Sequence, residues 1–148
     1  MRFFTELAGN RVFWAAVASW FVAQALKVVF TYIVERRWVL SRFFGLGGMP
    51  SSHSAVVCSV AVGTGMANGF YSSEFAIAFI LACVVMTDAA GVRRAAGQQA
   101  AVLNKIVQDM IESGRGLTSE SLKELLGHTP FEVIIGALLG VLIGILMV

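Results

Sequence analysis

The chain is short of charge, cysteine and proline. Only 14% of its 148 residues are charged and 57% are hydrophobic, which leaves too little polar surface for a soluble domain of this size. The two cysteines, Cys58 and Cys83, lie inside apolar runs, so neither a disulfide framework nor a cysteine metal site is expected. A net charge of +2 gives no argument for a nucleic-acid partner. These shortages predict a single membrane-embedded domain over residues 1–148, with the lipid bilayer around it.

Four apolar segments are candidates for membrane-spanning helices, each close to the length that crosses about 30 Å of hydrocarbon. They cover residues 12–34, 54–70, 75–92 and 131–148. The second is the weakest, because glycines and Asn68 dilute it, and a short or half-buried helix is the alternative there. Residues 98–112 have helical apolar spacing but are too polar to span. The predicted fold is therefore all-α: an integral membrane helical bundle of about four spanning helices, plus an amphipathic helix that lies on the membrane surface or packs over one end of the bundle.

Positive charge is divided unevenly between the two ends of these segments. One end holds Arg36, Arg37, Arg42, Arg93, Arg94, Lys105, Arg115 and Lys123, and the other holds Arg2 and Arg11. The positive-inside rule places the richer end in the cytoplasm and both termini outside. The prediction is a multi-pass protein of the cell (inner) membrane.

Polar residues from distant parts of the sequence meet at the predicted cytoplasmic end. They are Lys27 near the end of the first segment, Ser51, Ser52 and His53 at the start of the second, Asp88, Arg93 and Arg94 at the end of the third, and His128 and Glu132 at the start of the fourth. Two helices are predicted to begin here, at Pro50 and Pro130, and helix N-termini favour anions. With guanidinium forks nearby, this pattern predicts a phosphate site in which the histidines supply a nucleophile and a proton donor.

Each of these residues also has a structural alternative. Thr129 and Glu132 complete a capping box, although Glu132 also lies four residues after His128 and could orient its imidazole. Ser51 and Ser52 could only cap a helix, Arg93 and Arg94 could only anchor it at the interface, and His53 could be an interfacial histidine. Lys27 inside an apolar segment needs water or a partner, and Asp88 is a candidate partner for Lys27 or for an arginine.

Three glycines, Gly136, Gly140 and Gly144, recur every four residues in the last segment. Such a stripe lets another helix approach closely. It favours packing inside the monomer, and a seam between copies of a homo-oligomer is the alternative.

These residues resemble the motifs of the type 2 phosphatidic acid phosphatase superfamily, which includes the vanadium haloperoxidases, and in particular its small divergent bacterial and plastid branch. The matching stretches are Lys27, then Pro50-Ser51-Ser52-His53, then Arg93 or Arg94, then "HTPFEVIIGALLG" from His128. The spacing of the glycines after Glu132 agrees as well.

The resemblance implies a lipid phosphatase that hydrolyses a lipid phosphate monoester, such as phosphatidylglycerol phosphate or phosphatidic acid, at the cytoplasmic leaflet. In that scheme His128 attacks phosphorus and forms a phosphohistidine, Glu132 orients His128, and His53 protonates the leaving alkoxide. The phosphate oxygens are held by Lys27, Ser51, Ser52 and an arginine of the pair Arg93 and Arg94, and no metal or other cofactor is needed. A role for Asp88 is not implied.

Departures from the superfamily pattern keep other functions open. Ser52 stands where the superfamily has glycine, Glu132 where it has aspartate, and the first motif lacks its Arg-Pro ending. Arg93 and His128 are 35 residues apart, and the insertion between them could form a lid, could form a lipid-binding shelf, or could mark a site without activity. The alternatives are a non-catalytic membrane protein that binds a lipid or phosphate, an isoprenoid diphosphate phosphatase, and a small transporter or proton relay.

Overall fold

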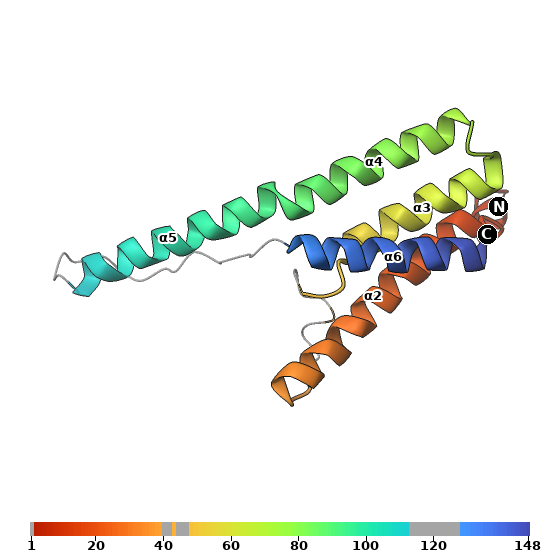
Figure 1. The fold of residues 1–148 in the computed structure, drawn as a ribbon. Helices are drawn as coiled ribbons and strands as arrows, with labels where there is room; N and C mark the ends of the chain where they lie inside the picture. Colours follow the sequence, from red (N-terminus) through yellow and green to blue (C-terminus); the bar gives the residue numbers. More distant parts are fainter. Residues whose placement is uncertain (1, 40–42, 44–47, 113–127) are drawn as a thin grey trace.

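The chain folds into α-helices joined by turns. The computed structural model describes residues 2–39, 43, 48–112 and 128–148. Its helices are α1 (Arg2–Ala8), α2 (Arg11–Glu35), α3 (Ser52–Asn68), α4 (Ser73–Ala90), α5 (Val92–Glu112) and α6 (Pro130–Met147). Figure 1 shows α2, α3, α4 and α6 gathered in a bundle, with both termini at one end. The predicted all-α class is confirmed, and each predicted spanning segment agrees with its helix to within two residues at either end.

Polar caps explain where the bundle helices begin. The side-chain oxygens of Asn10, Ser51, Ser72 and Thr129 each accept a hydrogen bond from the backbone N–H three residues further on. Such caps satisfy N–H groups that have no partner inside the helix. The starts of α2, α3, α4 and α6 are therefore encoded locally.

One predicted helix start is wrong and the other is confirmed. Helix α6 begins at Pro130, as expected for proline in the first turn. Helix α3 begins at Ser52 instead of Pro50, because Ser51 has an extended backbone (φ −67°, ψ 113°) and serves as the N-cap. Pro50 therefore lies just before the cap and is buried there.

Helix α3 is the centre of the bundle, since it packs against α2, α4 and α6. Its buried residues are mostly small: Ser52, Ser54, Ala55, Cys58, Ser59, Ala61, Gly63 and Gly65. Among the described helices, α2, α6 and the stretch from α4 into α5 are long and apolar enough to cross a membrane, whereas α3 has only 17 residues. The weak apolar signal of α3 follows from its position, because a helix surrounded by other helices needs close packing more than lipid-facing bulk.

The glycine stripe of α6 packs on the backbone of α3. A Cβ atom at Gly136 or Gly140 would fall on the carbonyl oxygen of Ser51 or Ala55, and one at Gly144 would lie 3.1 Å from that of Ser59. Partners on both helices advance in steps of four, so α3 and α6 run parallel. The stripe is thus used for packing inside the chain, as the sequence favoured.

Helices α2 and α4 run antiparallel to α3. Val12 at the start of α2 lies beside Gly63 near the end of α3, while Lys27 reaches Ser52 at its start. Helix α4 returns from α3 through the turn at residues 69–72. The starts of α3 and α6 and the ends of α2 and α4 therefore share one end of the bundle, called here the site end, and both termini lie at the opposite end.

Helix α5 carries the predicted amphipathic segment and begins earlier than predicted, at Val92. Figure 1 shows it continuing from α4 beyond the site end and away from the other helices. The alternative that this segment packs over the end of the bundle is therefore wrong for the described residues. A position on the membrane surface stays a prediction, and residues 113–127 of the predicted insertion lie outside the described residues.

Candidate active site

The two histidines of the chain face each other at the site end. Their ring centroids are 6.1 Å apart and their planes are inclined by 62°. His53 is half-buried in the first turn of α3, and His128 is buried two residues before α6. The structure thus brings together the two residues that the sequence proposed as nucleophile and proton donor.

Backbone contacts between the two helix starts fix this arrangement. The N–H of Ser51 donates to the carbonyl of Glu132 at 3.1 Å, so the cap of α3 is tied to the first turn of α6. The lack of a side chain at Gly136 lets that turn lie directly against Ser51. The histidines are therefore positioned by main-chain packing, which is stiffer than a contact between long side chains.

Glu132 has two partners at once. Its Oε2 atom lies 3.2 Å from Nδ1 of His128 and accepts the N–H of Thr129 at 3.0 Å. The Thr129 hydroxyl accepts the N–H of Glu132 at 3.3 Å, which completes the capping box. The capping role and the orienting contact, which the sequence left as alternatives, are both present in the geometry.

A carboxylate beside Nδ1 decides how the His128 imidazole can act. It favours the tautomer with the proton on Nδ1, which leaves the lone pair on Nε2. The backbone N–H of His128 also donates to the carbonyl of Ala89 at 3.2 Å, which joins the end of α4 to the site. His128 is thereby held through its ring by Glu132 of α6 and through its backbone by Ala89 of α4.

Lys27 is the buried cation of the site. It is only 4% exposed, and its Nζ donates to the hydroxyl of Ser52 at 3.2 Å. Glu132 is the acidic group that acts on it electrostatically. The serine that stands where the related superfamily has glycine is thus a hydrogen-bond partner of the site's lysine.

Ser51 is engaged mainly in structure. Its hydroxyl oxygen accepts from the N–H of Ser54 at 3.4 Å and from the hydroxyl of Ser54 at 3.0 Å, and the residue is fully buried. The predicted capping role of Ser51 is confirmed. Contact with a phosphate through its side chain stays a prediction.

The remaining predicted site residues lie around the junction of α4 and α5. Asp88 is half-buried in the last turn of α4, next to Ala89. Arg93 and Arg94 lie in the first turn of α5, and their side chains are outside the described part of the chain. Their chain positions keep all three near the site end, and their roles stay predictions.

A pocket of about 300 Å³ adjoins Lys27. It is lined by Lys27, Phe30, Thr31, Val34, Glu35, Gly48 and Met49. Its walls are mainly the last turns of α2 and the chain leading into α3. Over the described ranges, no group of three or more His, Cys, Asp or Glu residues could hold a metal ion.

Two groups in this arrangement escaped the sequence reasoning. Ser54 is a partner of Ser51, and the Ala89 carbonyl receives the N–H of His128. The serine at the third position after an N-cap is a visible signal, because that position faces the cap. A backbone carbonyl carries no residue-type signal, so only the packing of α4 beside α6 reveals it.

Known proteins resemble this chain along nearly its whole length. The family model described as "Divergent PAP2 family" matches residues 8–143. A protein of Bacillus subtilis (strain 168), named "Uncharacterized membrane protein YuiD", is 40% identical over 152 aligned positions, which cover 96% of this chain and 96% of that protein. No solved structure gives a significant match.

Proposed function

The chain belongs to the divergent PAP2 family, and on that premise we propose that it is a membrane-embedded lipid phosphatase. The proposed reaction hydrolyses a lipid phosphate monoester of the phosphatidylglycerol phosphate or phosphatidic acid kind, through a phosphohistidine. One observation carries the proposal: His53 and His128 face each other at 6.1 Å, with Glu132 against Nδ1 of His128.

The first chemical step uses both histidines. Nε2 of His128 attacks phosphorus, an N–P bond forms, and the P–O bond to the lipid breaks. The leaving alkoxide takes a proton from His53 and departs as the lipid alcohol. Water then attacks the phosphohistidine with His53 as base, the N–P bond breaks, and inorganic phosphate is released.

The separation of the rings suits a phosphoryl group between them. A reacting nitrogen has to approach phosphorus to about 3 Å, and a general acid has to reach the leaving oxygen at about 3 Å. With their centroids 6.1 Å apart, the two rings are close enough for both to approach one phosphoryl group. A ring pair packed face to face would leave no space for the phosphoryl group.

Charge near the rings supports phosphate as the ligand. Lys27 supplies a buried cation, and the starts of α3 and α6 supply backbone N–H groups with the positive ends of two helix dipoles. Ser51 and one of Arg93 and Arg94 complete the proposed phosphate contacts, and Ser52 holds Lys27 until a phosphate replaces it. Such donors stabilise the charge that develops on the phosphoryl oxygens in the transition state.

A lipid is the proposed substrate because the site lies at one end of a membrane bundle. The pocket beside Lys27 has apolar walls from Phe30, Val34 and Met49 with a hydroxyl at Thr31. These walls suit the junction between a phosphate headgroup and acyl chains. The positive charge around the site end supports the cytoplasmic leaflet as the location of the substrate.

The test is phosphate release by the purified protein in mixed micelles that contain phosphatidylglycerol phosphate or phosphatidic acid. We expect release by the wild type and a loss of about a thousandfold or more in His128→Ala, because that variant lacks the proposed nucleophile. His53→Ala should be slow in the first step. Activity that survives in His128→Ala would rule out the nucleophile assignment.

A non-catalytic lipid-binding role is the second candidate, and the contact between Lys27 and Ser52 favours it. A lysine already engaged by a side chain that the related superfamily lacks could hold a lipid phosphate without turning it over. This role predicts saturable binding of phosphatidic acid with no acid-labile phosphoenzyme after a radiolabelled lipid phosphate is added. Detection of that phosphoenzyme would decide for catalysis.

A further inference from the structure

The connection between α2 and α3 contacts α2 near the middle of that helix. Phe43, in this connection, lies against the rings of Trp20 and Phe21, with centroid distances of 5.8 Å and 6.2 Å. None of the three is a proposed catalytic or phosphate-binding residue. A connection that only joined two helix ends would not reach this point, so the contact needs an account that goes beyond the proposed function.

The depth of Phe43 follows from the helix that it contacts. Along α2, Phe21 lies about 21 Å from Glu35, where the helix ends. Lys27 is level with the start of α3, because its Nζ donates to Ser52, and Phe21 lies about 9 Å further from the site end along α2. Helix side chains lean toward the N-terminus, here away from the site end. Phe43 is therefore deeper in the bundle than either helix end that its connection joins.

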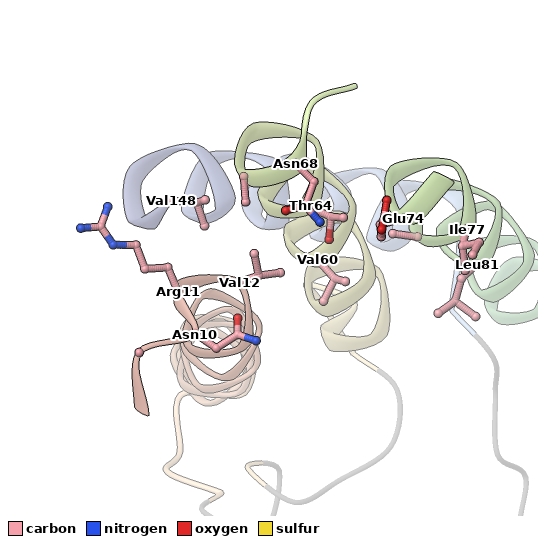
Figure 2. Close-up of a pocket in the computed structure, with 13 residues that line it drawn as sticks. Asn10, Arg11, Val12, Val60, Thr64, Asn68, Glu74, Ile77, Leu81 and Val148 are labelled. Carbon is pink, nitrogen blue, oxygen red and sulfur yellow. The ribbon is translucent and has the colours of Figure 1, made fainter. Parts of the chain in front are cut away.

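The contacting rings lie on the outer surface of the bundle. Helix α2 packs on α3 and α6, and an open cleft of about 750 Å³ separates it from α4 at the opposite end of the bundle (Figure 2). Phe21 is 53% exposed and Phe43 is half-buried, so the described helices leave both residues partly uncovered. In a membrane, an outer surface at this depth is covered by acyl chains.

The aromatic residues of this region change with depth as a bilayer favours. Tyr32 and Trp38 stack near the end of α2, with centroids 4.3 Å apart and planes inclined by 17°. Tyrosine and tryptophan suit the membrane interface, because each has an apolar body and one polar group, and Arg36 and Arg37 adjoin them in the chain. The side chain of Phe43 has no polar atom and lies deeper. The connection thus carries an interfacial residue first and an apolar one after it.

We propose that the connection between α2 and α3 re-enters the membrane, with the Phe43 ring inserted among the acyl chains of the leaflet at the site end. Its ring contacts with α2 hold it there, and backbone at this depth is tolerated because the connection packs on protein. Gly48 and Met49, later in the same connection, line the pocket beside Lys27. One wall of that pocket therefore belongs to the membrane-inserted connection.

The experiment measures depth with a nitroxide spin label on the full chain in proteoliposomes of phosphatidylethanolamine and phosphatidylglycerol. Labels are attached to Phe43→Cys, Phe21→Cys and Trp38→Cys in a Cys58→Ala, Cys83→Ser background. Power saturation compares collisions with oxygen, which concentrates in hydrocarbon, and with a water-soluble nickel complex. We expect labels 43 and 21 at similar depth, roughly 10–15 Å deeper than label 38, because about three turns of α2 separate the two ring clusters.

A second measurement uses the wild-type chain and does not depend on any substitution. The protein is irradiated in bilayers that contain a phospholipid with a diazirine near the end of its acyl chain, and adducts are located by mass spectrometry. Phe43 should carry adducts at a level comparable to Phe21, and Trp38 should carry fewer. Labelling of Phe21 without labelling of Phe43 would overturn the proposal.

The spin labels give two further outcomes that would contradict it. A label at residue 43 that meets the nickel complex as often as the label at residue 38 would place Phe43 in water. A label at residue 43 that is shielded from both reagents would show that protein covers it. Neither measurement involves a phosphate or a histidine, so failure of the proposed phosphatase function would leave both results unchanged.

Discussion

Lys27 on α2 and Ser52 on α3 are joined by a buried hydrogen bond of 3.2 Å from Nζ to the hydroxyl oxygen. A lysine within an apolar span is costly to bury unless it has partners, and one neutral hydroxyl compensates only part of that cost. Lys27 therefore keeps most of its electrostatic attraction for an anion such as phosphate. The pair also ties the affinity of the site for phosphate to the identity of residue 52.

Replacing Ser52 with glycine should raise the affinity for a lipid phosphate. Ser52→Gly removes the group with which a phosphate competes for Lys27. Hydrogen bonds to a charged group are worth about 1.5–3 kcal/mol, so Kd for phosphatidic acid should fall by roughly tenfold to a hundredfold. The same change should lower stability by about 0.5–1 kcal/mol, as glycine does in a helix. Binding to nanodisc-embedded protein and thermal unfolding measure the two effects.

Ser73→Gly is the matched control for this substitution, because Ser73 begins α4 just as Ser52 begins α3. It should lose a similar amount of stability with Kd unchanged. An unchanged or higher Kd in Ser52→Gly would show that the serine hydroxyl assists phosphate binding.

Two substitutions should separate the capping and orienting roles of Glu132. Glu132→Gln keeps an oxygen that can accept the N–H of Thr129 but removes the negative charge beside His128, so kcat should fall by about a hundredfold or more while the melting temperature changes little. Thr129→Ala removes the cap yet keeps that charge, so it should cost about 1 kcal/mol, or roughly 2–4 °C in melting temperature, with kcat nearly unchanged. Similar losses of kcat in both variants would mean that Glu132 acts only as a helix cap.

Alanine in the glycine stripe should destabilise the protein in a graded way. Gly136→Ala and Gly140→Ala place a methyl group on a backbone oxygen of α3, which should cost about 1–3 kcal/mol, and Gly144→Ala should cost less because its closest contact is 3.1 Å. Without these contacts, alanine would stabilise a helix by about 0.5–1 kcal/mol, so the sign of the change is decisive. Thermal unfolding in detergent gives the series, and stabilisation by Gly140→Ala would contradict the parallel packing of α3 and α6.

The orientation of the bundle can be tested with single cysteines in a Cys58→Ala, Cys83→Ser background. Tyr71→Cys lies in the turn at the opposite end, where Tyr71 is 94% exposed, and Arg37→Cys follows α2 at the site end. With the site in the cytoplasm, an impermeant maleimide should label residue 71 in intact cells and residue 37 only after membrane disruption. The reverse pattern would place the site outside and favour an isoprenoid diphosphate as substrate.

Much of this fold could be predicted from local signals in the sequence. The capping box at Thr129, the start of α6 at Pro130 and the stripe at Gly136 depend on residues close together in the chain, and each is present as predicted. The meeting of His53 and His128 followed from counting apolar segments, because successive spans alternate in direction.

Features that depend on which helices face each other were not predictable in this way. The partner of Lys27 could have been Asp88 or water, and only the packing of α2 on α3 selects Ser52. The direction of α5 was also open, because an amphipathic pattern fixes which face of a helix is apolar and leaves its angle to the preceding helix undetermined. Helix α5 extends α4 past Gly91 and away from the other helices, so only the alternative in which it packs over the end of the bundle is wrong.

The short central helix has a consequence for the bilayer itself. With 17 residues, α3 is about 25 Å long, which is less than the thickness of roughly 30 Å of a typical hydrocarbon core. When its far end is level with one surface, the first turn with His53 lies a few ångströms below the other, so the membrane has to thin locally for a headgroup to reach it. Because of this hydrophobic mismatch, the thickness of the host membrane should affect how easily a lipid headgroup reaches the site. Lipids with shorter acyl chains form thinner bilayers, so their phosphates should lie closer to the histidines.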